Sequence, residues 1–122
     1  MEASGLITVV QLFENVSIKN TDEDSTILVD LQELASNGIF SVHAVITGSG
    51  ASITITYKLS HYASGTYLTP GTASDICTAV NPGAGGLNEI YPVSPELSRF
   101  MKINVAEGAD VTATVNLWLA IQ

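Results

Sequence analysis

Residues 51–59 read ASITITYKL, and apolar and polar side chains alternate strictly along them. A period of two is that of a β-strand, because successive side chains of a strand point to opposite faces of the sheet. One face of this strand is therefore expected to lie in the core and the other in water. The expected core residues are Ile53, Ile55, Tyr57 and Leu59.

Residues 40–46 have the same alternation, and the turn at residues 48–50, Gly-Ser-Gly, separates them from the first stretch. A slip of one residue would carry every apolar side chain to the wrong face, so the pattern restricts the register of any pairing. Pairing Ile46 with Ile53 keeps all the apolar residues in phase and leaves a four-residue loop. We therefore expect a hairpin.

The C-terminal region repeats this arrangement. Residues 101–105 and 111–121 alternate in the same way, and Glu-Gly-Ala at residues 107–109 separates them. A second hairpin is expected here, with Val105 facing Val111.

The remaining segments complete an all-β chain. Residues 6–13 fit either a helical stripe or an extended run, and their β-branched residues favour a strand. Residues 60–95 are expected to be mostly loop with short strands, because they hold all four prolines. The prediction is one antiparallel β-sandwich of jelly-roll-like topology over residues 26–122, preceded by an N-terminal arm or edge strand over residues 1–25.

Composition excludes several classes of partner. The 122 residues carry 12 acidic and only 4 basic side chains, for a formal charge of −8. Four basic side chains cannot neutralise a run of phosphates. We therefore expect neither nucleic acid nor an anionic membrane as a partner. No apolar stretch is long enough to span a membrane and no basic leader is recognisable, so synthesis in the cytoplasm is expected. The single cysteine excludes an internal disulfide.

No catalytic constellation is recognisable, and we expect neither enzymatic activity nor a cofactor. His43 and His61 lack the paired spacing of metal ligands, and His43 falls on the polar side of its strand, as a partly covered surface histidine would. Cys77 has no basic neighbour and is expected to be a small buried hydrophobe. Among the acidic residues, Asp75, Glu89 and Glu96 could in principle form an acid–base pair. A small domain with twelve acidic residues is expected to bring some of them close together by chance.

Two aromatic residues are expected on the solvent-facing side of the C-terminal strands. Trp118 lies on the polar phase of the last strand, and in the expected second hairpin Phe100 lies on the same outward face. Three explanations remain open: cover by another part of the chain, a subunit interface, or a platform on which sugars stack. The candidate interface residues are Leu6, Val9, Val10, Phe13, Phe100 and Trp118.

Several segments resemble small virion structural proteins of tailed bacteriophages, which are typically encoded among head genes. The similarity covers residues from about 30 to the end of the chain, and rests on pattern rather than on a catalytic motif. The segments are 38–42 (GIFSV), 47–50 (TGSG), 53–57 (ITITY) with 59–60 (LS), 94–97 (SPEL), 100–103 (FMKI), 111–115 (VTATV) and 117–122 (LWLAIQ).

The resemblance implies a β-sandwich decoration, or cement, protein that binds the outside of an assembled capsid and stabilises it. Its implied partner is the major capsid protein, its implied oligomer a trimer, and its implied location the capsid surface of the virion. We expect the apolar segment 6–13 to reach a neighbouring subunit or the shell.

Two alternatives stay open. One is a phage adhesin or carbohydrate-binding β-sandwich, whose loops at residues 62–70 or 83–91 would contact the ligand. The other is a tail or head-completion structural protein.

Overall fold

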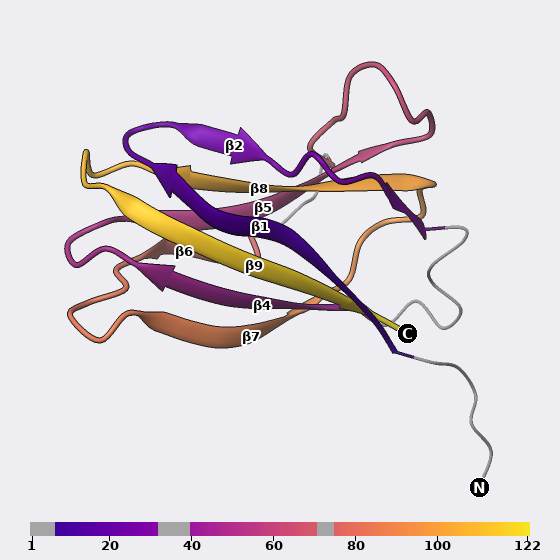
Figure 1. Cartoon of the computed structure of the whole chain (residues 1–122). Helices are drawn as coiled ribbons and strands as arrows, with labels where there is room; N and C mark the ends of the chain where they lie inside the picture. Colours follow the sequence, from indigo (N-terminus) through magenta and orange to yellow (C-terminus); the bar gives the residue numbers. More distant parts are fainter. Residues whose placement is uncertain (1–6, 32–39, 71–74) are drawn as a thin grey trace, which may run out of the picture.

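The computed structural model describes residues 7–31, 40–70 and 75–122. Its strands form two facing antiparallel sheets in a single small domain (Figure 1). The strands are β1 (Thr8–Ile18), β2 (Asp22–Asp24), β3 (Val29–Asp30), β4 (Phe40–Thr47), β5 (Ile53–Ser60), β6 (Cys77–Val80), β7 (Leu87–Val93), β8 (Phe100–Glu107) and β9 (Ala113–Ile121).

The strand order is that of a jelly roll. One sheet, here called sheet A, has the order β1-β9-β4-β7; the other, sheet B, has the order β2-β8-β5-β6, with β3 also paired to β8. The short strands β2 and β3 thus share one position beside β8. The connections from β2 to β3 and from β5 to β6 stay within sheet B. All the other connections cross to the opposite sheet, which gives the two interlocked sheets of this fold. The predicted all-β, jelly-roll-like sandwich is confirmed.

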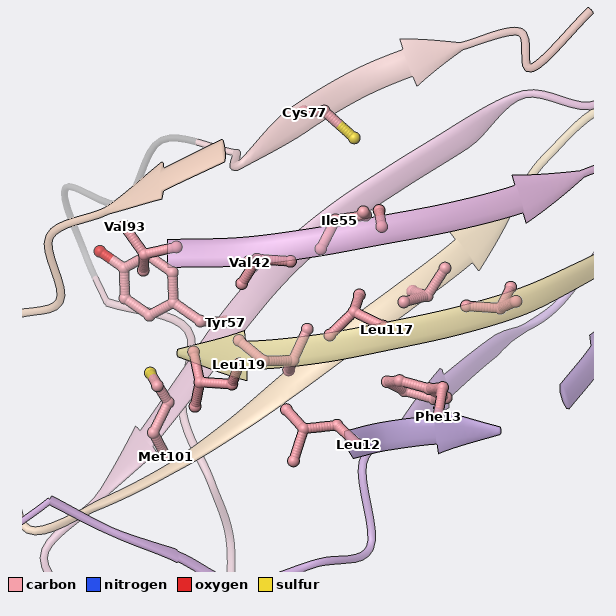
Figure 2. Close-up of a cluster of buried hydrophobic side chains, with 14 of the residues drawn as sticks. Leu12, Phe13, Val42, Ile55, Tyr57, Cys77, Val93, Met101, Leu117 and Leu119 are labelled. Atoms are coloured by element: carbon pink, nitrogen blue, oxygen red, sulfur yellow. The ribbon is translucent and has the colours of Figure 1, made fainter. Parts of the chain in front are cut away.

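The inner faces of both sheets fill one apolar core, part of which Figure 2 shows. The predicted inward residues of the four alternating stretches are buried, apart from Val111, which is partly buried; Ile53 and Ile55, for example, are 0% exposed. Alternation along the sequence therefore identified the core-facing side of each of these strands.

The two predicted hairpins are wrong. Strand β4 pairs with β9 and β7, whereas β5 pairs with β8 and β6, so Ile46 lies opposite Val115 and Leu87 rather than opposite Ile53. Likewise β8 and β9 lie in different sheets. The physical reason is that two strands with their apolar faces in phase can pair side by side or face each other across the core. Both arrangements bury the same side chains.

The connection between β4 and β5 is an arch from one sheet to the other, and Gly48 makes it possible. Gly48 has a φ of +142°, and a Cβ added there would lie 2.8 Å from the carbonyl oxygen of Thr112, next to the start of β9. The backbone can approach β9 this closely only without a side chain. The arch is closed by the Ala51 N–H, which donates to the Gly48 carbonyl at 3.0 Å.

We expect Gly48→Ala to lower the free energy of unfolding by about 1–3 kcal/mol, because it adds both backbone strain and a clash. Gly83→Ala is the matched control: its φ is +73°, but a Cβ there meets nothing within 4 Å. The control isolates strain alone and should cost about 1 kcal/mol. Urea denaturation checks both, and equal losses would show that the close approach to β9 has no energetic weight.

The N-terminal segment forms a strand, as predicted, and β1 is an edge strand of sheet A. Its pairing with β9 is broken by two bulges, and Leu12 and Phe13 are both buried although they are adjacent. The first bulge shifts the alternation by one residue, so Val10 and Phe13 both face the core, at a spacing of three that a helical stripe also has. Asn15, at a φ of 50°, lies in the second bulge. The division of the chain at residue 25 stays a prediction.

The structure has no helix, among the residues it describes, of the length and apolar character that crossing a membrane requires.

Candidate interaction surfaces

The outer face of sheet A is the first candidate surface, and we call it the neutral face. It consists of the outward residues of β4 and β9 and the residues paired with them on β1 and β7. These residues are Val9, Gln11, Ser17, Ser41, His43, Val45, Thr47, Asn88, Ile90, Pro92, Thr114, Asn116, Trp118 and Ala120. None of them is Asp, Glu, Lys or Arg.

A stacked pair of rings lies at the middle of the neutral face. His43 on β4 is paired with Trp118 on β9, and their ring centres are 5.4 Å apart at an interplanar angle of 31°. The His43 Nε2 atom is 2.7 Å from Asn88 Oδ1 on β7. His43 is half-buried, so the predicted partly covered histidine is confirmed. Trp118 is also half-buried and points outward as predicted.

The outer face of sheet B has the opposite character. The Lys58 Nζ atom is 3.1 Å from Asp24 Oδ1, and Arg99 is 3.3 Å from Asp30. Burial raises the pKa of Asp24, but hydrogen bonds from Asn104 and Lys58 outweigh it and leave that pKa below its ordinary value. Lys102 is directly paired with Lys58. This face is therefore charged.

Phe100 belongs to this charged sheet, so the prediction that it shares an outward face with Trp118 is wrong. It pairs with Asp30 on β3 and Ser60 on β5, and it is only 5% exposed. The Arg99 guanidinium lies 5.0 Å from the centre of its ring. The expectation failed because it assumed that β8 and β9 form a hairpin.

A cleft of about 540 Å³ is the second candidate surface. It lies where β5 ends, and residues of the loop after β5 form most of its wall. Reciprocal backbone hydrogen bonds of 2.8 and 2.9 Å between Leu59 and Leu68 hold this loop to the strand. Three apolar side chains of the wall are highly exposed: Tyr62 (76%), Leu68 (66%) and Leu97 (98%). An exposed apolar rim of this kind is typical of an interaction site.

Tyr57 connects this end of the sandwich to the core. Its ring is buried, and its hydroxyl donates to Glu96 Oε1 at 2.5 Å, next to Leu97 of the cleft. Burial, together with the hydrogen bond to Glu96 and the charge of that carboxylate, raises the pKa of Tyr57 to about 12. The hydroxyl therefore stays protonated and keeps donating at any physiological pH.

We expect Tyr57→Phe to lower the free energy of unfolding by about 1–2 kcal/mol, because the hydrogen bond to a carboxylate is lost while the ring stays packed. Tyr67→Phe serves as the control, since the Tyr67 hydroxyl donates to an uncharged acceptor, the Ala63 carbonyl, at 3.1 Å in an exposed loop. Chemical denaturation of the two variants checks this. A greater loss at Tyr67 would contradict the proposed anchoring role of Tyr57.

Two of the carboxylates considered for an acid–base pair bind different partners. Glu96 binds Tyr57, and Asp75 accepts from the Thr78 hydroxyl at 2.8 Å. Cys77 is 8% exposed, and burial raises the pKa of its thiol, as expected of a small buried hydrophobe. In the part of the chain that the structure describes, no three His, Cys, Asp or Glu side chains are grouped to hold a metal ion.

Glu107 is a buried polar residue that was not predicted from the sequence. It is 2% exposed, and its carboxylate accepts four backbone N–H groups at 2.6–3.1 Å. The donors come from three separate connections and are Asn20, Ser52, Ala109 and Val111. A signal was present: Glu107 continues the inward phase of Met101, Ile103 and Val105. A carboxylate on the core side of a strand requires hydrogen-bond donors.

The predicted interface residues have different positions in the structure. Val9 is 60% exposed on the neutral face, and Val10 packs partly against the core. Phe13 is 4% exposed and belongs to the core of its own chain. Leu6 lies outside the described residues. Of the six residues, the neutral face holds Val9 and Trp118.

Comparison with known proteins gives a fold but no family. No protein-family model matches the chain, and no curated protein matches it either. A chain in the structure of the Gx strain of infectious bursal disease virus superposes with a TM-score of 0.56 and 11% identity, over 95% of this chain and 32% of that one. A chain of the VP2 subviral particle of infectious bursal disease virus gives a TM-score of 0.47, also at 11% identity, over 96% of this chain and 32% of that one. Our chain therefore spans about a third of the length of these proteins, and the first likeness supports the jelly-roll fold.

Proposed function

We propose that this protein is a non-enzymatic structural component of a virus particle. The observation that carries the proposal is the superposition of 95% of the chain on part of a virus protein, with a TM-score of 0.56. Jelly rolls are a recurrent fold of viral capsid proteins, although the fold alone does not fix the function. The resemblance of residues 38–60 and 94–122 to virion proteins of tailed phages points the same way.

More specifically, we propose a decoration protein that binds the outer surface of a tailed-phage head as a homotrimer. The major capsid protein is its proposed partner. The exposed apolar rim of the cleft, Tyr62, Leu68 and Leu97, would supply the contact with the shell. Affinity for the head would increase with the number of linked copies, because each bound copy raises the effective concentration of the next.

Binding to heads tests this proposal. Purified protein is mixed with empty expanded heads assembled from the major capsid protein of the same genome, and the pellet is analysed after sedimentation. We expect saturable binding at a fixed ratio to capsid subunits, and a loss of binding in the Leu97→Asp variant, because a charge replaces an apolar contact. No binding of the unmodified protein would refute the decoration function.

A sugar-binding adhesin is the second candidate, and the cleft is the observation that favours it. Tyr62 is available there for stacking on a sugar ring. The ring of Tyr67, by contrast, is already in contact with Lys102, whose Nζ atom is 4.4 Å from its centre. The other predicted ligand loop, residues 83–91, is only partly a loop, because β7 begins at Leu87. Glycan-array binding that is lost in Tyr62→Ala would favour the adhesin. A tail or head-completion role would instead give a low copy number per particle.

A further inference from the structure

We infer that the neutral face is the surface through which copies of this chain bind one another. The inference deepens the homo-oligomer part of the proposed function and rests on it. The occupant of the face is therefore a second copy of the same chain.

The distribution of charge supports this occupant. Each chain carries a formal charge of −8, so two copies repel each other wherever acidic surfaces meet. The central strands β4 and β9 carry no charged side chain, and the two carboxylates of sheet A, Glu14 and Glu89, lie on its edge strands β1 and β7. Contact between copies through the middle of this sheet meets the least repulsion.

Sheet B shows that such neutrality is not a general property of the fold. On its outer face, Asp24, Lys58 and Lys102 lie on three neighbouring strands. Both outer faces would be in contact with water in a monomer, yet only the outer face of sheet B carries charged side chains, the type that is most rarely buried. The difference between them is what burial of the neutral face in an oligomer would produce.

The neutral face also has the anatomy of an interface. A row of directly paired residues, Gln11, Trp118, His43 and Ile90, crosses all four strands of sheet A. The stacked rings of Trp118 and His43 lie on the two central strands, and Ile90, 66% exposed, lies beside them. Interfaces between proteins combine a centre that is poor in charge and rich in large aromatic residues with a polar rim.

The area of the neutral face indicates how tightly two copies are expected to bind each other. Four strands about 4.8 Å apart and about 30 Å long cover roughly 500 Å², which is less than the about 800 Å² per partner of stable complexes. We therefore expect a Kd in the micromolar range in solution, and tighter association where copies sit side by side on a shell.

The test measures the molar mass of purified full-length protein at about 100 µM, well above a micromolar Kd, by size-exclusion chromatography with light scattering. We expect a multiple of the 12.8 kDa chain mass. Ile90→Asp should raise the Kd for self-association at least about tenfold, because it puts a carboxylate into the neutral face of every copy. Ile90 is exposed, so this change leaves the core intact. Trp118→Ala should also raise the Kd for self-association.

Leu97→Asp is the matched control, since it makes an equivalent change at a side chain that is 98% exposed but lies on the cleft. It should leave the oligomer intact, and urea denaturation should show that both Asp variants are folded. A monomeric unmodified protein would overturn the inference, and so would an oligomer that Leu97→Asp dissociates and Ile90→Asp does not.

Head binding, measured on the same samples, separates this inference from the proposed function. Oligomers that depend on Ile90 but do not bind heads would uphold the inference and remove the decoration function. A monomer that still binds heads would overturn the inference and uphold the decoration function.

Discussion

Replacing Glu107 by alanine is expected to destabilise the whole sandwich, because one buried carboxylate satisfies N–H groups from three connections. Its Oε1 accepts from Asn20 and Val111, and its Oε2 accepts from Ser52 and Ala109. These donors belong to the connections between β1 and β2, β4 and β5, and β8 and β9. Without the carboxylate, the partly buried hydrogen bonds of all three connections are lost. We expect a clear drop in the urea midpoint with an unchanged slope.

The pH dependence gives this prediction a specific signature. Burial opposes ionisation of Glu107, but the four backbone donors outweigh it and lower its pKa from 4.5 to about 2. A pKa that is lower in the folded than in the unfolded state stabilises the fold above the unfolded value. The contribution is therefore complete above about pH 4.5 and is lost as the pH falls towards 2.

Glu107→Gln tests this signature with little change of shape. Its amide nitrogen is a donor and cannot accept an N–H, so the variant should be less stable than the unmodified protein at pH 7. The gap between the two should narrow as the pH falls from 4.5 to 2 in a series of urea titrations. A gap that is constant over this interval would show that ionised Glu107 does not hold the three connections together.

Leu117→Ala is expected to cost about 2–5 kcal/mol of unfolding free energy, because it opens a cavity in a core with little room to collapse. Leu117 is 0% exposed and lies in the middle of β9, which pairs on both sides with β1 and β4 (Figure 2). Thermal and urea denaturation measure the loss.

Thr114→Ala is the control on the same strand. Thr114 points outward and is half-buried, so its replacement should cost less than about 1 kcal/mol. Equal losses at the two positions would contradict the assignment of inner and outer faces along β9.

Strand phase was readable from the sequence, whereas strand partners were not. The alternation in β4, β5 and β9 identified their buried residues correctly, and in β8 it identified Met101, Ile103 and Val105 but not Phe100. Both predicted hairpins failed because Ile46 and Ile53 contribute to the same core from opposite sheets. An in-phase pattern fits neighbours in one sheet and neighbours across a core equally well.

The candidate surfaces likewise show that the direction of a side chain could be predicted from its own strand, but the strands beside it could not. Trp118 was identified from its own strand alone, and the structure places it outward. Phe100 was assigned through an assumed partner strand, and it lies buried in the other sheet. The neutral face could not be seen in the sequence, because its residues come from four strands spread between residues 9 and 120.

The sequence by itself determined the class of structure and the inner side of most strands, because alternation is a local property of a chain whose side chains point alternately to two faces. The sequence also determines the formal charge of −8, and its two histidines do not have the paired spacing of metal ligands. Only the tertiary structure decided the order β1-β9-β4-β7, the acceptor role of Glu107 and the existence of the neutral face. These depend on which distant strands meet. Pairing between strands is set by the summed packing of the whole core, to which a single segment contributes only a part.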